Sequence, residues 1–322
     1  MKNSTASGII LYAKRPGMTS FSSLGLIKKA LQTGKVGHTG TLDSFAEGLL
    51  VVLVGKLTKL VPHITAADKT YQAVISFGKE TDTLELSGEV IKTAPIPSKK
   101  QILEVLPQFF GNIQQIPPLY SALHIDGKRA SDIARSGKEV EMPSRPVTIN
   151  SLEMLDYSEN EGIGVFQVSC SKGTYIRSLA RDIAKAAGSC AHLVALRRIK
   201  VGAFSLDDAV FENSLGDFDI NSKGCTEQKC EPYTEKDLQL VRDNLQPLTP
   251  QMAAVCGLKT STLISKYSSD FFTGKPLRKK WFDSSLAEGE NAVFSEDGSF
   301  AGIIKYSEDR LKYGFVIKPG NE

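Results

Sequence analysis

The sequence predicts an α+β fold, in which a mixed, largely antiparallel sheet is flanked by helices and a small β-rich unit follows at the C-terminal end. Three observations lead to this class. Strand and helix patterns are mixed without the regular alternation of a parallel α/β protein. The 322 residues exceed the usual length of one domain. Hydrophobic residues make up 41% and charged residues 23% of the chain, as in globular proteins with a full apolar core.

The first half begins with a strand over residues 8–14, which ends at the turn formed by Arg15, Pro16 and Gly17. A helix with Thr19 or Ser20 as its N-cap is predicted to run to about Thr33. A glycine-rich loop over 34–47 follows. The remaining elements of this half are a buried strand over 49–54, a helix over 56–66, strands over 71–77 and 89–92, and a helix from Ser98 to Phe109.

The second half opens with a basic excursion over 119–146, which has room for a short helix over 130–135. It continues with strands over 147–157 and 164–171, a helix over 174–187 that ends at Gly188, and a strand over 192–201. The tail has strand-like runs over 291–294, 301–305 and 313–317. These patterns divide the chain into a body (1–212), a linker or insert (213–246) and a tail (247–322).

The charge is distributed unevenly. Residues 207–243 carry ten acidic and four basic side chains, a net charge of −6, which leaves +9 on the rest of a chain whose net charge is +3. We expect the acidic stretch to be an exposed connector. A basic body suits a polyanion such as nucleic acid, although solvated surface charges chosen for solubility explain the same count.

Several classes of protein are excluded by missing patterns. The longest apolar run, over 49–54, is far shorter than the roughly 20 residues of a membrane span. The apolar stretch over 9–13 is also shorter than the core of a signal peptide, so we expect none. Five thinly spread cysteines indicate reduced thiols, so we expect a cytoplasmic location. No glycine–lysine pair is followed by Ser or Thr as in a P-loop, and the histidines and cysteines lack the spacing of a zinc site. We therefore expect neither cofactor nor metal.

Two stretches contain candidate reactive groups. The loop over 34–48 presents His38 and a carboxylate, Asp43, just before an apolar strand, where partial desolvation makes a carboxylate a candidate nucleophile or base. From spacing alone, an Asp that caps a turn is the more common explanation of the position. Tyr175 and Arg177 lie where a strand turns into a helix, so that the guanidinium could hold a buried carboxylate ionised or form only a surface ion pair.

Further candidates lie at strand positions. Lys69 and Tyr71 begin one strand, where a tyrosine is more often an amphipathic residue at the core edge than a catalyst. The neighbours Arg197 and Arg198 in the last strand of the body are either solvated or phosphate-binding.

Seven motifs together resemble those of a known family. They are Gly37–Asp43 followed by Ala46 and Gly48, the pair Lys69 and Tyr71, Thr81–Thr83, Pro117–Ala122, Gly127–Arg129, Gly173–Arg177 and Ala191–Arg198. They occur in the order found in TruB-type tRNA pseudouridine synthases and span about residues 8–212. The tail is similar to a PUA-like RNA-binding domain. The sequence departs from the family at Ser44, where proline is usual, and at Glu85, where aspartate is common; neither change removes a chemical group from the reaction.

This resemblance implies a tRNA pseudouridine synthase with the pseudouridine synthase fold. The enzyme would isomerise the T-loop uridine 55 of elongator tRNAs without a cofactor. It would act as a monomer and would not associate with a membrane. It makes Asp43 the nucleophile and Tyr71 and Arg177 its catalytic partners. It assigns substrate binding to His38, Lys69, Tyr71, Lys128, Arg129, Lys172, Tyr175 and Leu196, and RNA gripping to the excursion over 119–146. His38 would help to extrude the nucleotide.

Two alternatives remain open. An RNA-binding or tRNA-folding module that has kept the fold without turnover would use the same basic body. An N-glycoside hydrolase based on Asp43 would instead give an abasic product. The presence of Asp43, Tyr71 and Arg177 together favours isomerisation over binding alone.

Overall fold

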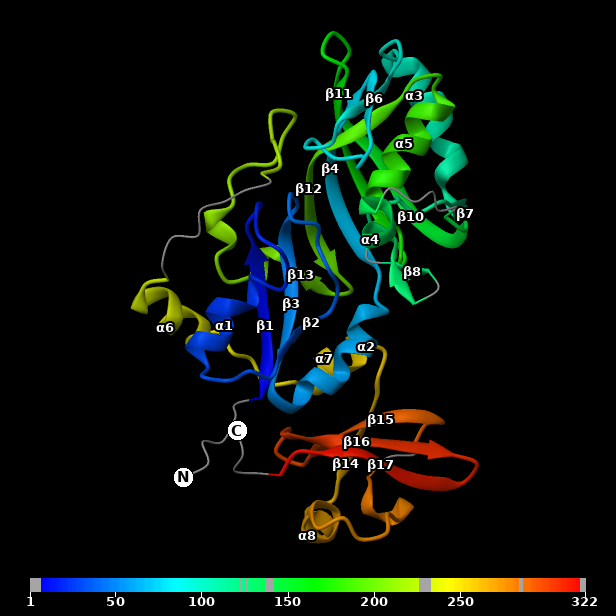
Figure 1. The fold of residues 1–322 in the computed structure, drawn as a ribbon. Helices are drawn as coiled ribbons and strands as arrows, with labels where there is room; N and C mark the ends of the chain where they lie inside the picture. The colour runs from blue at the N-terminus through cyan, green and yellow to red at the C-terminus, as the bar shows by residue number, and fades with distance from the viewer. Residues whose placement is uncertain are drawn as a thin grey trace.

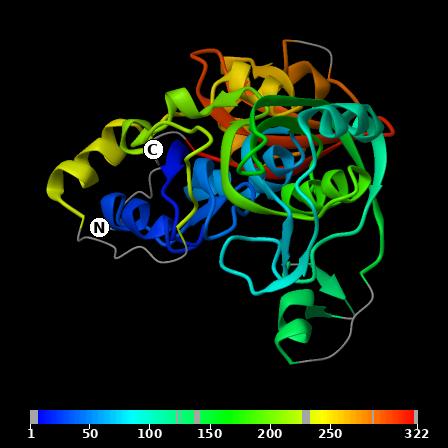
Figure 2. The same cartoon turned by 90° about the horizontal axis from the view of Figure 1, so that it is seen from above.

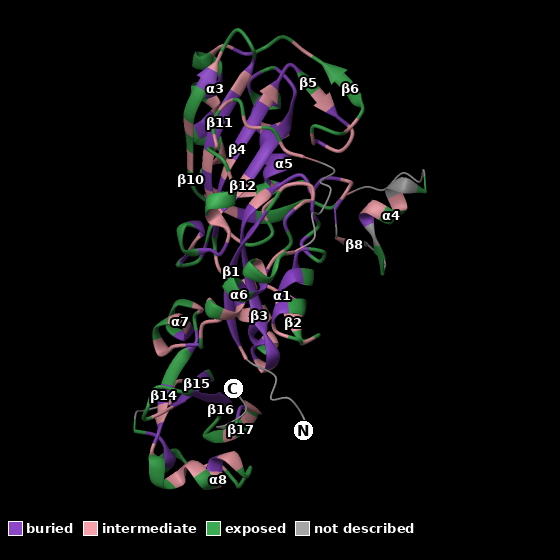
Figure 3. Ribbon diagram, turned by 90° about the vertical axis from the view of Figure 1, so that its left-hand side faces the viewer, coloured by how far each residue is buried: buried purple, intermediate pink, exposed green. Residues whose placement is uncertain are grey.

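A computed structural model describes residues 7–121, 123–125, 127–136, 142–225, 233–283 and 286–318. It has two stacked parts, a large mixed sheet with helices and a smaller C-terminal sheet (Figure 1). The central strands of the large sheet are buried (Figure 3). Across the described residues, no helix has both the length and the apolar character that a membrane span requires.

Nine strands form the large sheet within the described residues, in the order β1-β3-β12-β4-β11-β10-β7, with β2 beside β3 and β13 beside β12. Neighbours are antiparallel except for β3 and β12, so the predicted class of a mixed, largely antiparallel sheet is confirmed. The strands are β1 (Gly8–Lys14), β2 (Val36–His38), β3 (Glu47–Val54), β4 (Lys69–Phe77), β7 (Gly111–Gln115), β10 (Arg145–Ser158), β11 (Ile163–Cys170), β12 (Ala191–Val201) and β13 (Phe204–Ser205).

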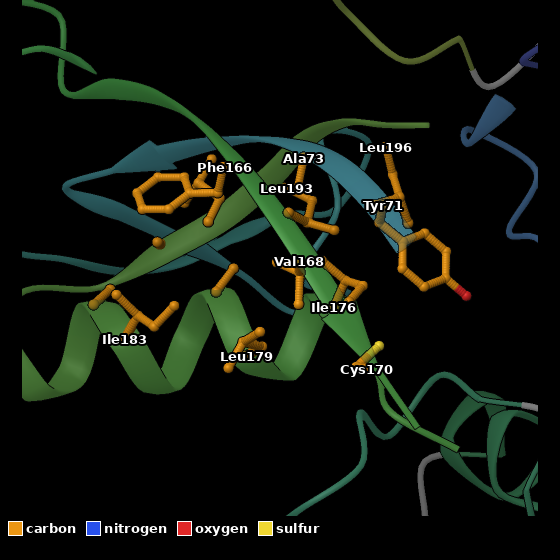
Figure 4. Close-up of a cluster of buried hydrophobic side chains, with 14 of the residues drawn as sticks. Tyr71, Ala73, Phe166, Val168, Cys170, Ile176, Leu179, Ile183, Leu193 and Leu196 are labelled. Carbon is orange, nitrogen blue, oxygen red and sulfur yellow. The ribbon is translucent and has the colours of Figure 1, made fainter. Parts of the chain in front are cut away.

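Helix α5 (Ile176–Ala186) covers one face of the strands β4, β11 and β12. Its apolar residues recur at helical spacing, and Ile176, Leu179 and Ile183 pack against Phe166 and Leu193 (Figure 4). Helix α3 (Lys99–Val105) starts at Ser98 as expected, in a capping box with Gln101. The strands β5 (Lys79–Thr81) and β6 (Val90–Thr93) form a separate hairpin.

The first helix is shorter than its sequence pattern predicts. Helix α1 spans Leu24–Ala30 rather than about 20–33, because the Thr19 side chain accepts from the Ser22 amide and its carbonyl from Ser23, which makes 19–23 a hydrogen-bonded turn. The expected helix over 56–66 is divided into a 3₁₀ segment (Gly55–Leu60) and α2 (Val61–Thr65). Within the large sheet, the strands β2, β7 and β13 were not predicted; each is five residues or shorter.

The acidic stretch is not simply an exposed connector, and this expectation needs correction. Residues 235–243 form helix α6 (Glu235–Asp243), capped by Thr234, and its Leu238 and Val241 side chains are buried in a cluster with α1 and β1. The apolar pair at i and i+3 is the signal that the high charge of the segment conceals.

Most of the described part of the excursion over 119–146 stands away from the sheet (Figures 2 and 3), although Arg145 and Pro146 already belong to β10. It contains the short pair β8 (His124–Ile125) and β9 (Lys128–Arg129), followed by α4 (Ala130–Arg135), which matches the helix expected there. Within it, residues 122, 126 and 137–141 lie outside the described part of the structure.

The C-terminal sheet has the order β14-β15-β16-β17 and is a separate sheet, as predicted. Its strands are β14 (Lys259–Leu263), β15 (Gly289–Ser295), β16 (Phe300–Ser307) and β17 (Arg310–Val316), and its helices are α7 (Pro250–Val255) and α8 (Ser268–Phe272). Residues of this unit, including Phe294 and Phe300, share one apolar cluster with Leu11 and Leu57 of the body. The two sheets are therefore joined by a common core rather than by a linker alone.

Candidate active site

A cleft of about 350 Å³ opens where the loop before β3, the start of β4, the turn between β11 and α5, and the strand β12 meet. Its lining includes eight of the candidate residues named from the sequence: Asp43, Lys69, Tyr71, Lys172, Tyr175, Arg177, Leu196 and Arg198. The structure thus brings together side chains from four separate segments. The volume lies in the range of small-ligand pockets in proteins.

The centre of the cleft is an ion pair between Arg177 and Asp43. Arg177 Nε lies 3.0 Å from Asp43 Oδ2, and Nη2 donates to Oδ1 at 3.2 Å, so the guanidinium faces both carboxylate oxygens. The Arg177 side chain is 4% exposed and that of Asp43 is 34% exposed. Asp43 is therefore oriented from one side by a buried cation and remains accessible from the cleft.

A second carboxylate shares this guanidinium. Arg177 Nη1 lies 2.7 Å from Glu85 Oε1, and the remaining N–H groups reach the carbonyls of Thr83 and Tyr120. Burial raises the pKa of Glu85 to about 7, and the Asp43 charge adds to this rise while Arg177 opposes it. Glu85 was noted from the sequence only as a departure from a motif, and the position of Arg177 between two carboxylates was not foreseen.

The backbone of the Asp43 loop, which we define as residues 40–46, is held by buried polar side chains. Lys14 Nζ donates to the carbonyls of Ala46 at 2.6 Å and Ser44 at 3.3 Å. Ser20 Oγ accepts from the Leu42 amide at 2.8 Å and donates to the Leu42 carbonyl at 3.0 Å. Burial lowers the pKa of Lys14 to about 7, although Asp43 and Glu47 partly counter this effect. The loop is therefore fixed at its backbone, independently of its side chains.

Arg198 supports the loop from β12. Its side chain is fully buried and donates from Nε to the Leu49 carbonyl at 2.8 Å and from Nη2 to the Gly40 carbonyl at 3.1 Å. A Cβ at Gly48 would lie 2.4 Å from the Arg198 carbonyl oxygen, and Gly48 has a φ of +103°, so glycine is required there. Neither arginine of the Arg197–Arg198 pair is simply solvated: Arg198 holds backbone carbonyls, and Arg197 pairs with Glu47.

Tyr71 lies at the edge of the apolar cluster, with its hydroxyl directed away from the neighbouring aliphatic side chains (Figure 4). Burial raises the pKa of Tyr71, and the nearby positive charge of Arg198 only partly offsets this. Its phenol is therefore protonated at neutral pH. The side chain can present a ring face and a hydroxyl to a ligand, but it is not a phenolate base by itself.

The other predicted residues in the cleft differ in their surroundings. Lys69 Nζ donates to the Thr65 carbonyl at 2.6 Å, and burial lowers the pKa of Lys69 to about 8. Lys172 is exposed at the rim. Tyr175 is held through its backbone, since its amide donates to Gln115 Oε1 at 2.8 Å. Leu196 is buried and faces the cleft from β12. The cleft thus has cationic walls around a single central carboxylate.

Three predicted residues do not line the cleft. His38 is half-buried on β2, beside the loop, and burial lowers its pKa. Lys128 is exposed on β9, in the excursion that stands away from the sheet. The side chain of Arg129 lies outside the described part of the structure. The roles expected for these residues remain predictions.

Comparison with known proteins gives matches over most of the chain. Residues 28–176 match the family model described as TruB family pseudouridylate synthase (N terminal domain), and residues 177–249 match tRNA pseudouridylate synthase B C-terminal domain. The chain is 39% identical to the tRNA pseudouridine synthase B of Treponema denticola, with 96% of this chain and 98% of that protein aligned. It is 47% identical to the protein of the same name from Borreliella burgdorferi strain ZS7, over 65% of this chain and 74% of that one.

Among solved structures, the fold is similar to a chain in a Cbf5-Nop10-Gar1 complex. The TM-score is 0.66 at 22% sequence identity, covering 98% of this chain and 86% of the other. A chain in an H/ACA RNP bound to a substrate RNA that contains 2′-deoxyuridine gives a TM-score of 0.65 at 20% identity. These two likenesses concern the fold alone.

Proposed function

This chain belongs to the TruB family of pseudouridylate synthases, and we propose that it isomerises uridine to pseudouridine in tRNA, at position 55 in the T-loop of elongator tRNAs. The observation that carries the proposal is the Asp43 carboxylate, which buried Arg177 orients and which lines a cleft of about 350 Å³. We propose further that the protein acts as a monomer in the cytoplasm, with tRNA as its partner.

The reaction needs one carboxylate near the ribose and a grip on the detached base. The N1–C1′ bond breaks, the uracil turns, C5 bonds to C1′, and the proton leaves C5 while N1 gains one. In the proposal Asp43 is the nucleophile that attacks C1′; removal of a C2′ proton by the same carboxylate, giving a glycal, is the other route open to it. Arg177 keeps the carboxylate aimed in either case.

The cleft walls supply the grip. Tyr71 would stack on the uracil, and its protonated phenol would help to remove the C5 proton through a relay rather than as a phenolate. Tyr175 and Leu196 would enclose the base. Lys69 and Lys172 would contact the phosphate or the RNA loop. Because the two carbonyls of Thr65 and Ala67 already accept from the Lys69 ammonium, Lys172 is better placed for a direct phosphate contact.

The rest of the molecule would bring the tRNA to this cleft. A uridine inside a folded T-loop must swing outward before it can enter, and His38 beside the Asp43 loop would help to extrude it. The excursion over 119–146, with Lys128 and Arg129, would grip the RNA, and the PUA-like C-terminal sheet would contact the acceptor stem. RNA loops are recognised in this way, by shape and backbone charge.

The product of a single incubation tests the proposal. The protein is mixed with unmodified tRNA and with a T-arm hairpin, and the nucleosides are separated after digestion. Pseudouridine at position 55 supports the proposal, unchanged RNA indicates a binding or folding module, and free uracil indicates a glycoside hydrolase.

The carboxylate assignment has its own test. Asp43→Asn keeps the shape of the side chain and removes its charge, so turnover should be lost while the dissociation constant for tRNA stays within about threefold of the wild-type value. Filter binding and single-turnover assays measure the two quantities. A variant that still isomerises uridine at a comparable rate would contradict the assignment.

A further inference from the structure

Residues 214–225 lie on the face of the large sheet opposite to α5, and we call them the back segment. They belong to the acidic stretch whose sequence suggested only a connector. Phe218 and Ile220 pack against a cluster that includes Val74 and Val194, while Asp217 and Asp219 face solvent. In Figure 1 this yellow-green part of the chain runs beside β12. The back segment is therefore seated on the strands that carry the cleft residues.

One attachment is a sheltered ion pair. Arg197 Nε donates to Glu47 Oε1 at 2.7 Å, and Arg197 Nη2 donates to the Gly216 carbonyl at 2.7 Å. The Phe218 ring lies over the guanidinium, 4.9 Å from its carbon to the ring centroid. The Arg197 and Glu47 side chains are only 12% and 15% exposed, so water screens this pair much less than a surface pair. Glu47 directly follows the Asp43 loop.

A second attachment reaches the loop itself. The Gly224 amide donates to the Val194 carbonyl at 2.8 Å. A Cβ at Gly224 would lie 2.7 Å from Phe45 Cδ2 and 3.0 Å from the Phe45 carbonyl oxygen, so only glycine allows this approach. Phe45 is 1% exposed and lies two residues after Asp43. At the other end of the segment, Ser214 Oγ accepts from Arg15 Nε at 3.2 Å.

We propose that the back segment is a positioning element for the isomerisation, which sets the backbone path of the Asp43 loop through Gly224 and the Arg197–Glu47 pair. The inference rests on the proposed function. Arg177 fixes the carboxylate of Asp43. The chain on the C-terminal side of Asp43 is placed by Phe45, which Gly224 approaches closely, and by Glu47, which pairs with Arg197. Arg197 in turn donates to the carbonyl of Gly216 in the back segment. These residues touch no substrate; they act through Asp43.

Gly224→Ala with Gly216→Ala as its matched control tests this inference in the full-length protein. A Cβ at Gly216 meets no atom within 4 Å, and that variant keeps the carbonyl that accepts from Arg197. For Gly224→Ala, kcat on tRNA should fall about 10- to 100-fold, because a misplacement of about 1 Å is enough for such a loss. Its KM and its affinity for tRNA should stay within about twofold of the wild type. Gly216→Ala should match the wild type.

The outcomes separate this inference from the proposed function. Wild-type protein that forms no pseudouridine refutes the function itself. An active wild type together with an unchanged kcat in Gly224→Ala overturns only the positioning role, as does a loss shared equally between kcat and tRNA affinity. Should Gly224→Ala fail to unfold cooperatively, Glu47→Gln replaces it. That variant keeps the shape of the side chain but not its charge, and a kcat equal to the wild-type value then overturns the inference.

Discussion

At the scale of single residues, the site depends on how one buried guanidinium is shared. Arg177 contacts the carboxylates of Asp43 and Glu85 and the carbonyls of Thr83 and Tyr120, so its donors are directed on several sides. A planar fork of five N–H groups can do this, whereas the point charge of lysine cannot. The charge state of Glu85 therefore affects the strength of the ion pair between Arg177 and Asp43.

The Glu85 carboxyl predicts a pH dependence of stability. Its pKa is raised to about 7 in the folded protein and is near 4.5 in the unfolded chain. Between these values the folded state holds a proton that the unfolded state has released, so the free energy of unfolding falls as pH rises through this window. Glu85→Gln should flatten that fall by on the order of 1–3 kcal/mol between pH 5 and 7.5.

Urea unfolding at several pH values measures this difference. Glu89→Gln is the control, because it removes the same type of side chain from an exposed position on the same connecting segment. Parallel pH profiles for the wild type and Glu85→Gln would show that Glu85 is ionised with an ordinary pKa in the folded protein.

The sequence motifs named most of the residues that line the candidate site, but they did not predict its electrostatics. Asp43, Tyr71 and Arg177 were named from the sequence, and the cleft brings them together. Lys14 was not named, and Glu85 and Arg198 were noted without the contacts that the structure gives them, since each contribution depends on burial and on contacts with segments more than 30 residues away in the chain. Burial of a charged side chain is set by tertiary packing, which local sequence patterns do not report.

At the scale of elements, patterning predicted the long strands and helices and missed those stabilised by distant partners. The strand β3 reads as a continuous apolar run because both its faces are buried. By contrast, β7 is a short edge strand that exists through its pairing with β10. Helix α6 was hidden by the acidic composition around it, although Thr234 and Asp237 form a capping box at its start.

Helix α6 gives a prediction at this scale. Leu238 is buried against α1 and β1, so Leu238→Ala should lower the free energy of unfolding by about 2–4 kcal/mol through lost burial and a cavity. Leu240 lies on the same helix but is exposed, and Leu240→Ala should change stability by less than about 0.5 kcal/mol. Thermal and urea unfolding compare the two variants. Equal effects would mean that α6 is not packed on the body.

At the scale of the whole molecule, the C-terminal sheet is tied to the body close to the cleft. His63 of α2 lies 2.9 Å from Glu290 of β15, and Lys59 Nζ lies 5.0 Å from the Phe315 ring centroid of β17. Helix α2 ends at Thr65, which lines the cleft and whose carbonyl accepts from Lys69 Nζ. A tRNA bound across both parts would therefore meet a fixed spacing between the sheet and the Asp43 carboxylate.

The distribution of charge over the molecule predicts how tRNA binding responds to salt. The chain outside residues 207–243 carries a net charge of +9, and the excursion over 119–146 projects from it with Lys128 exposed (Figure 2). Each phosphate contact that is lost should flatten the slope of log affinity against log salt by about 0.7–0.9, because fewer counterions are released. Neutralising Lys128, Arg129 and Arg135 together should therefore reduce the slope by roughly two.

The salt dependence of tRNA affinity, measured with a control variant, decides whether the excursion belongs to the binding surface. Affinities for tRNA are measured at several salt concentrations for the triple variant and for a control in which the exposed Lys99 and Lys100 of α3 become Gln. The control removes charge from the body without touching the excursion, so a general loss of electrostatic attraction would lower both slopes together. A slope that falls only in the triple variant indicates direct phosphate contacts. An unchanged slope there would remove the excursion from the tRNA interface and leave RNA binding to the cleft rim and the C-terminal sheet.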